Sequence, residues 1–274
     1  MSISRAPADF DRSISPPENR GEHETGRTLH IATYNIHKGL SFFNQRLILH
    51  ELRDQLHGLD VDVVFLQEVV GEHALHATRF RDWPRNTQYE FLADSMWPDF
   101  AYGKNAVYGH GHHGNAILSR FSIVNWENED ISAHRFESRG LLHCELAIPG
   151  WKDTLHCICV HLGLFRRGRS QQLEAIEKRI RQLVSPDAPL VVAGDFNDWR
   201  GAANPLLASR LNLVEVFQHT HGKAARSFPS VLPLLRLDRI YIRGFQVKNA
   251  QILHNRPWSR ISDHAVLSAN IMRT

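Results

Sequence analysis

The sequence has little cysteine and no long apolar run. Three of its 274 residues are cysteine, and an odd, sparse count argues against a disulfide framework and fits a reducing compartment. No stretch reaches the ~20 apolar residues that a membrane-spanning helix needs. The N-terminus lacks the apolar core of a signal peptide. We therefore expect a cytoplasmic protein with no transmembrane segment.

No sign of charge dominates either. The chain has 32 Lys and Arg against 29 Asp and Glu, which gives a net charge of +3 with its 18 histidines neutral. This mildly basic balance permits an anionic substrate but does not demand nucleic acid. A 274-residue chain that is 42% hydrophobic fits one large globular domain, or at most two small ones, and we expect a monomer.

The apolar pattern divides the chain into a tail and an ordered domain. Residues 1–27 are polar, carry several prolines and glycines, and show no apolar period, which predicts a disordered tail before a domain at 28–274. Apolar residues at helical spacing predict helices at 46–57 and 170–184. Strands are predicted at 28–34, 61–66, 116–119, 141–147, 154–160, 190–194, 237–242 and 265–271. This pattern fits two packed sheets flanked by helices, or a single doubly wound sheet.

One predicted strand ends in a segment typical of a catalytic site. Residues 191–198 read VVAGDFND, so a run of strand-forming residues leads to Asp195 and Asn197. Residues two apart on a strand point the same way, and Gly194 leaves room near the backbone. A carboxylate beside a carboxamide suits a site where water is both deprotonated and oriented. By contrast, Cys157 and Cys159 alternate within a strand, as small core residues do.

Other predicted strands end in polar motifs of the same kind. Seven such motifs follow one another along the chain: Thr33 to His37, Phe65 to Val69, Gly114 to Arg120, Val160 to Leu162, Ala193 to Asn197, Arg236 to Ile240 and Ser262 to His264. In this order they resemble the endonuclease/exonuclease/phosphatase family of metal-dependent phosphoesterases, over residues 29–271. The resemblance implies an α/β fold, a four-layer α/β/β/α sandwich of two mixed β-sheets with the site at one end of both sheets.

The resemblance also implies a metal site. Mg²⁺ or Mn²⁺ would neutralise phosphate charge, and hard oxygen ligands hold such ions. Glu68 is the best candidate ligand. Asn35 would coordinate or orient through its amide oxygen, and Asp263 would complete the shell.

The same resemblance gives roles to five further residues. Asp195 resembles the general base that takes a proton from the attacking water, and Asn197 would orient that water or a phosphate oxygen. His264, held by Asp238, would stabilise the five-coordinate phosphorus or assist the leaving group. His161 would bind a non-bridging oxygen, and neighbouring carboxylates favour the imidazolium form of these histidines.

The substrate side departs from the family. Nucleases of the family often carry a second acid two residues after the first Asn, where this chain has His37 followed by Lys38. One of these two would contact a substrate phosphate, or His37 is only a loop residue beside the site. We also predict substrate contacts from Asn115 and from Arg166, although charge runs at helix entries are often merely solvated.

Two groups of side chains have no fixed assignment. His110 to His113 reads as a flexible loop near the substrate, with zinc binding as the alternative. Five aromatic residues in predicted loops would line a pocket or flank the core: Phe42, Phe43, Trp97, Trp199 and Trp258.

These expectations favour a divalent-metal-dependent hydrolase of phosphate esters, and within that class a phosphodiesterase. The phosphodiester substrate is a small molecule, a lipid or a nucleic acid. One alternative is a nuclease acting on DNA or RNA. The other is a catalytically inactive binding scaffold of the same fold, against which the intact set of site residues argues.

Overall fold

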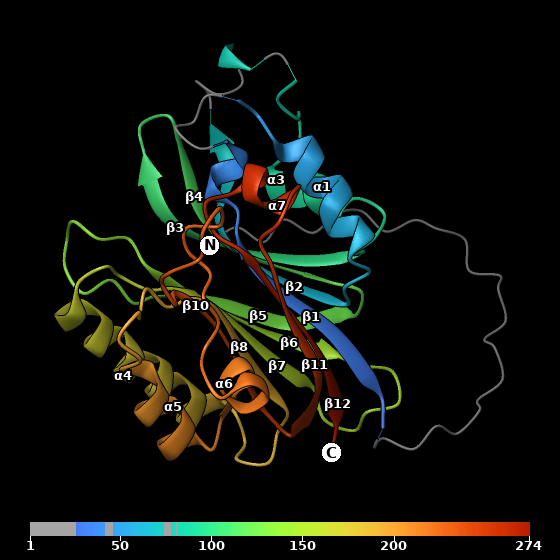
Figure 1. The fold of residues 1–274 in the computed structure, drawn as a ribbon, viewed down its shortest axis with the longest axis vertical. Helices are drawn as coiled ribbons and strands as arrows, with labels where there is room; N and C mark the ends of the chain where they lie inside the picture. The colour runs from blue at the N-terminus through green and yellow to red at the C-terminus, as the bar shows by residue number, and fades with distance from the viewer. Residues whose placement is uncertain (1–25, 42–45, 74–77, 81) are drawn as a thin grey trace, which may run out of the picture.

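Several strands of this chain are apolar on both faces, so each must be covered on two sides. In the strand at Val63–His73, Val63 and Phe65 pack into one hydrophobic cluster, while Val64 and Leu66 pack into another. The computed structural model describes residues 26–41, 46–73, 78–80 and 82–274. Two sheets pack face to face and helices lie on their outer faces, so these strands are covered on both sides (Figure 1).

The first sheet has six strands in the order β11-β12-β1-β2-β4-β3. They span Phe245–Leu253 (β11), Val266–Arg273 (β12), Thr28–Asn35 (β1), Val63–His73 (β2), Gly111–Ser119 (β4) and Asp99–Tyr108 (β3). Strand β1 is antiparallel to β12 and parallel to β2, so the sheet is mixed.

The second sheet also has six strands, in the order β5-β6-β7-β8-β10-β9. They span Ser122–Asp130 (β5), Gly140–Ala147 (β6), Leu155–His161 (β7), Leu190–Asp195 (β8), Asp238–Arg243 (β10) and Val214–Glu215 (β9). Strand β7 is parallel to β8 but antiparallel to β6, so this sheet is mixed as well.

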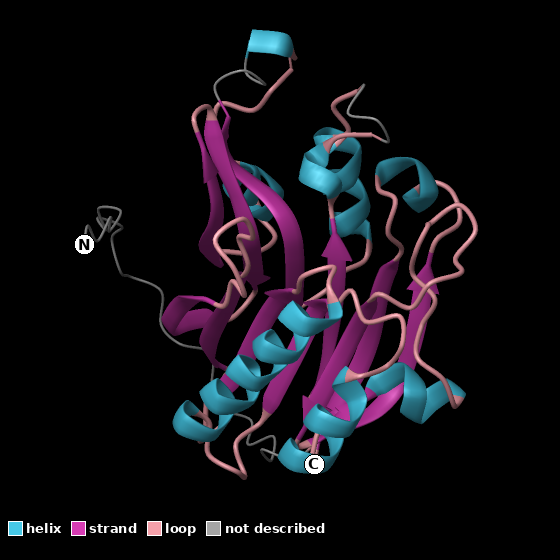
Figure 2. Cartoon of the chain, turned by 90° about the vertical axis from the view of Figure 1, so that its left-hand side faces the viewer, coloured by secondary structure: helices cyan, strands magenta, loops and turns pink. Residues whose placement is uncertain are grey.

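Helices cover the two outer faces. Helices α1 (Leu49–Gly58), α3 (Gln88–Ala93) and α7 (Trp258–Ile261) pack on the first sheet through one apolar cluster. Helices α4 (Arg166–Leu183) and α5 (Ala203–Leu211) pack on the second through another, and α4 lies in front of the strands in Figure 2. Helix α6 (Val216–His221) contributes to the core between the sheets, and η1 (His37–Gly39) is a single 3₁₀ turn. The predicted four-layer α/β/β/α sandwich is confirmed, and the single doubly wound sheet is excluded.

The core between the sheets contains all three cysteines. Cys144, Cys157 and Cys159 are buried free thiols. Burial raises the pKa of each thiol. Cys157 and Cys159 are therefore small core residues, as predicted, and Cys144 is another. Among the described residues, no helix combines the length and the apolar character that crossing a membrane requires.

All eight strands predicted from the sequence are present, and within the described part of the chain the four that were missed lie at sheet edges. The missed strands are β3, β5, β9 and β11, which end the two strand orders. Strand β5 has no buried residue, and β11 has only two. An edge strand half in solvent needs no apolar run, so it leaves little apolar signal in the sequence.

Three predicted boundaries near the site were wrong. Helix α4 begins at Arg166, four residues before the predicted start. Strand β2 continues past Glu68 through a register shift instead of ending there. His112 and His113 lie in β4 and not in a flexible loop.

Two predictions fall mainly outside the described residues. The proposed tail at 1–27 is described only at Gly26 and Arg27, whose backbones hydrogen bond to Arg273. Phe42 and Phe43 lie outside the described ranges altogether.

Candidate active site

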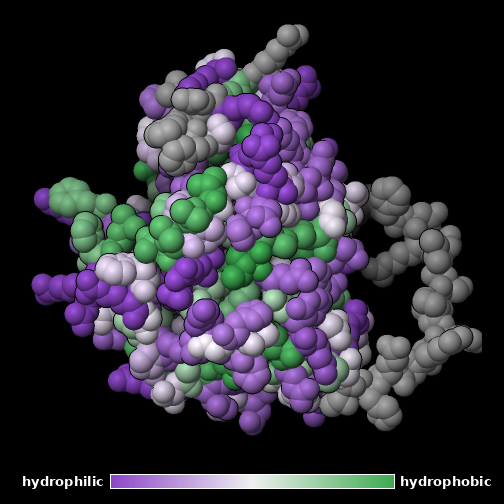
Figure 3. All heavy atoms as spheres, in the orientation of Figure 1, coloured by the Kyte–Doolittle hydropathy of each residue, from purple (hydrophilic) through white to green (hydrophobic). Residues whose placement is uncertain are grey.

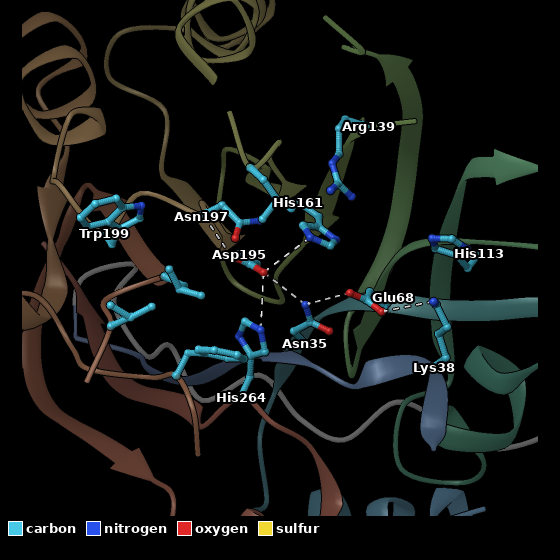
Figure 4. Close-up of a pocket in the computed structure, with 14 residues that line it drawn as sticks. Asn35, Lys38, Glu68, His113, Arg139, His161, Asp195, Asn197, Trp199 and His264 are labelled. Carbon is cyan, nitrogen blue, oxygen red and sulfur yellow. Dashed lines mark hydrogen bonds and ion pairs between the residues drawn. The ribbon is translucent and has the colours of Figure 1, made fainter. Parts of the chain in front are cut away.

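The carboxylate of Asp195 lies at the centre of a polar cluster. Asp195 is the last residue of β8 and is only 2% exposed. The Asn35 side chain donates a hydrogen bond from Nδ2 to Oδ2 of Asp195 at 3.2 Å. The same oxygen lies 3.5 Å from Nε2 of His161 and 3.8 Å from Nε2 of His264 (Figure 4). The ends of β1, β7 and β8 and the segment before β12 thus meet at one carboxylate, which brings both sheets together.

Backbone geometry at the end of β8 fixes this carboxylate. Gly194 has φ +145°, and a Cβ there would overlap the carbonyl oxygen of Val160 in the adjacent strand. Only glycine tolerates both conditions. Asn197 also has a positive φ, 48°, and its N–H donates to Oδ1 of Asp195 at 2.9 Å. Such strain costs free energy and persists where surrounding contacts hold it.

Asn197 is itself held in one orientation. Its Nδ2 donates to the carbonyl oxygen of Leu162 at 2.9 Å. The side-chain carbonyl oxygen is then the group directed at the pocket (Figure 4). A carbonyl oxygen accepts a hydrogen bond from water but cannot donate one to a phosphate oxygen. Of the two roles predicted for Asn197, the geometry therefore favours orienting water.

His264 and Asp238 form a buried pair. Nδ1 of His264 donates to Oδ2 of Asp238 at 2.9 Å, and Asp238 is completely buried at the start of β10. Its backbone N–H donates to the hydroxyl of Ser227. Burial alone would lower the pKa of His264, but Asp238 and Asp195 outweigh it and raise that pKa well above its usual range. Burial also raises the pKa of Asp195, which His264 only partly opposes.

His161 behaves in the opposite way. Burial, reinforced by the charge of Arg139, lowers the pKa of His161 to about 3. The ring is therefore neutral near pH 7 (about four units above its pKa). The expectation that carboxylates favour the imidazolium form holds for His264 and is wrong for His161. A neutral His161 offers an N–H without a charge.

The candidate metal ligand Glu68 lies across the pocket. It has φ 56° at the irregularity in β2, and its Oε1 accepts a hydrogen bond from Asn35 at 3.5 Å. Lys38 Nζ lies 4.0 Å from Oε2. Burial would raise the pKa of Glu68, but its neighbours, His161 first and then Lys38, outweigh burial and hold that pKa below its usual range. An ionised oxygen ligand is thus available to a hard cation.

A second group of ligand atoms lies deeper. One atom each from Asp195, Asp238 and His264 falls within 4.8 Å of the others. Two of these residues already share a short hydrogen bond, and Asp238 has no exposure. The more open carboxylate, Glu68, therefore fits a hydrated divalent cation better, because Mg²⁺ keeps several waters. Asn35 orients this carboxylate through Nδ2, while its own Oδ1 accepts a hydrogen bond from the His37 N–H.

The remaining predicted residues lie at different distances from the pocket. Asp263 lies beside His37, with 3.5 Å between Oδ1 and Nδ1, and Lys38 rather than His37 lines the cavity. Asn115 is buried in β4, where its side chain donates to the carbonyl oxygen of Gly140, and it does not line the pocket. Arg166 is exposed on the first turn of α4 and is not brought to the pocket.

Sequence reasoning missed several residues around this cavity of about 510 Å³. Arg139 precedes β6 and points into the pocket near His161 (Figure 4). Its place just before a predicted strand was the only signal. His113 and the apolar residues Leu164, Phe228, Leu235 and Leu237 also line the cavity. Of the described aromatic candidates, Trp199 lines it, whereas Trp97 is buried in the core and Trp258 packs on Tyr34 from α7.

A scan against family models matches residues 32–264 to the Endonuclease/Exonuclease/phosphatase family. The match covers most of the chain, which therefore belongs to this family. The fold is that of a family of metal-dependent phosphoester hydrolases.

Individual relatives share the sequence or the fold of this chain. The chain is 49% identical over 242 residues to "Uncharacterized protein YbhP" of Escherichia coli K12, covering 88% of this chain and 95% of that one. The mannosyl-6-phosphatase Bt3783 of Bacteroides thetaiotaomicron has the same fold, with TM-score 0.67, 16% identity, and 89% and 99% coverage. So does D. rerio TDP2 in complex with a single-strand DNA product, with TM-score 0.64, 16% identity, and 89% and 98% coverage.

Proposed function

We propose that this chain is a divalent-metal-dependent phosphodiesterase in which Asp195 activates the attacking water. The observation that carries the proposal is the placement of one buried carboxylate against Asn35, His161 and His264 at the base of an open pocket. Burial raises the pKa of Asp195 toward the range in which a carboxylate accepts a proton from water effectively.

Each neighbour has a task in this proposal. The carbonyl oxygen of Asn197 orients the water toward phosphorus while Asp195 removes its proton. Neutral His161 donates its N–H to an oxygen in the site. Charged His264, held by Asp238, stabilises negative charge on the phosphate and can give its proton to the leaving oxygen.

The metal would be held by Glu68, with Asn35 and Asp263 supporting the shell. Mg²⁺ or Mn²⁺ would supply neutralisation of phosphate charge. Lys38 and Arg139 add fixed positive charge on the pocket wall, which favours an anionic substrate before any chemistry occurs.

A nuclease is the second candidate. Trp199 is half exposed at the pocket, and Arg200 lies over its ring at 4.5 Å. A base of single-stranded nucleic acid can stack on such a platform. The structural neighbours act on or bind different phosphorylated molecules, so the fold does not choose between the candidates. The cytoplasmic, monomeric state expected from the sequence stays a prediction.

The first experiment measures hydrolysis of bis-p-nitrophenyl phosphate with Mn²⁺ or Mg²⁺, with and without chelator. We expect metal-dependent turnover that Asp195→Asn lowers by at least about 10²-fold, because a positioned base contributes roughly that much. Asp187→Asn, an exposed carboxylate after α4, is the matched control. Metal-independent turnover, or an Asp195→Asn enzyme within a few-fold of the parent, would refute the mechanism.

The second experiment compares substrates at equal concentration. Plasmid DNA, single-stranded oligonucleotides, p-nitrophenyl phosphate and phospholipids are incubated with the same metal-loaded enzyme. Fastest cleavage of nucleic acid, weakening steeply with added salt, would establish the nuclease instead. Preference for the monoester would assign a phosphatase.

A further inference from the structure

Three loops and the N-terminal end of α4 expose large apolar side chains to solvent around the pocket. They are 134–139, 164–167, 199–200 and 231–236. Their exposed members are Phe136, Leu164, Phe165, Trp199, Val231, Leu232, Leu234 and Leu235, with exposures from 40% to 81%. Figure 3 shows hydrophobic residues running from the left-hand edge toward the middle of this face. Single exposed apolar residues are ordinary, but a continuous group marks an interaction surface.

This apolar rim surrounds the catalytic pocket. Leu164, Trp199 and Leu235 line the pocket that holds Asp195. Phe136 and Phe165 line an adjoining cavity of about 340 Å³ that shares Leu164 with the first. Whatever covers the rim therefore lies directly over the site.

The rim is also basic. Arg135 lies over the ring of Phe136, as Arg200 does over Trp199, each at 4.5 Å. Arg166 and Arg167 follow Phe165 directly and are exposed. The one acid in the four segments is Glu137, which accepts a hydrogen bond from Gln172 and is 10% exposed. Exposed charge on the rim is thus of one sign.

We propose that this rim docks the protein on an anionic phospholipid surface. Apolar side chains at loop tips enter the boundary between headgroups and acyl chains, while neighbouring arginines meet the lipid phosphates. Most exposed members are aliphatic and offer no ring on which a base could stack, which disfavours nucleic acid as the occupant. A second copy would bring two sets of unpaired arginines together across an isologous contact.

Docking in this way turns the pocket toward lipid headgroups. The substrate would then be a phosphodiester of a membrane lipid. This consequence rests on the proposed function. The docking itself does not, because it depends on surface residues and can be measured in protein that cannot turn over.

The test is co-sedimentation with vesicles, using Asp195→Asn protein without added metal. We expect binding to mixed phosphatidylcholine and phosphatidylglycerol vesicles and weaker binding to phosphatidylcholine alone. Replacing Phe165 and Leu232 together by Ser should weaken binding by at least about tenfold. The matched control replaces Val124 and Trp126, which are comparably exposed on β5 away from the pocket, and should change little.

Charge is tested separately. Replacing Arg135 and Arg167 by Gln should weaken binding to the mixed vesicles by about thirtyfold and leave phosphatidylcholine binding nearly unchanged. Added salt should weaken binding of the parent in the same direction.

Three outcomes would overturn the proposal. The first is no sedimentation with either vesicle, or equal losses in the rim and control pairs. The second is concentration-dependent dimerisation that the Phe165 and Leu232 pair abolishes, which would assign the rim to a second copy. The third is oligonucleotide binding by the parent that the Phe165 and Leu232 double variant loses, which would assign the rim to nucleic acid. If the protein binds vesicles but the metal-loaded parent hydrolyses no phosphoester, the docking proposal stands and the proposed function is refuted.

Discussion

Lowering the pH should destabilise this protein through a buried histidine pair on the second sheet. His143 on β6 pairs with Ile158 on β7, two residues from His156, so the two rings are diagonal neighbours on one face of the sheet. They are 3% and 7% exposed and share a hydrogen bond of 3.0 Å between Nε2 of His143 and Nδ1 of His156. Arg179 donates to the other nitrogen of His143 at 3.4 Å. A ring that accepts from arginine and donates to histidine must be neutral, so protonation disrupts the chain of hydrogen bonds.

The magnitude follows from the pKa values. Burial first, then His156 and Arg179, lowers the pKa of His143 from 6.5 to about 4, against the weaker opposing charges of Glu145 and Glu127. Because the folded pKa lies below the unfolded one, the stabilisation is complete above about pH 6.5 and is lost as the pH falls toward 4. About 2 kcal/mol of unfolding free energy should disappear between about pH 8 and about pH 5 from His143 alone.

The assay is urea unfolding at both pH values for the parent and His143→Gln. A Gln amide can accept from Arg179 and donate to His156 without titrating, so the variant should lose about 2 kcal/mol less than the parent on acidification. His219→Gln, at an exposed site on α6, should keep the parental loss. If the parent and His143→Gln lose equal stability, the reasoning fails, because other titrating groups would then account for the whole effect.

Three further predictions concern the site. Glu68→Gln should raise the Mg²⁺ concentration for half-maximal rate by about tenfold or more, since the amide lacks the charge that binds a hard cation; an unchanged metal titration would move the ligand role elsewhere. Asp238→Asn should impair turnover less than His264→Ala, and the double variant should show less than the sum of both losses, because the pair acts as one unit. Additive losses would show independent action. Gly194→Ala should destabilise the fold by about 2–4 kcal/mol in urea unfolding, because its Cβ would overlap a β7 carbonyl oxygen, whereas Gly58→Ala, with open space, should not.

Burial determines how much of the fold could be predicted. The eight interior strands are apolar over long runs because sheets and helices cover both faces, and that pattern is visible in the sequence. The edge strands β3, β5, β9 and β11 are partly solvated and so resemble loops. Short helices such as α7 were missed because four residues cannot show a helical period.

The candidate site divides in a similar way. Asp195, Asn197 and Asn35 follow buried strands, so local sequence both forms the strand and fixes where its polar end lies. Arg139 has no such signal. It reaches the pocket only because β6 lies beside β7 and brings the preceding residues over His161.

The sequence by itself determined the eight interior strands and the order of their polar ends, since strand formation and the spacing of apolar residues depend on neighbours along the chain. Its apolar pattern left open whether these strands form two packed sheets or one, which the tertiary structure decided. Only the tertiary structure decided the charge of His161, the start of α4 at Arg166 and the apolar rim over the pocket. These properties depend on desolvation and on distances between segments far apart in sequence. Energies of that kind are set by packing, and no local pattern encodes them.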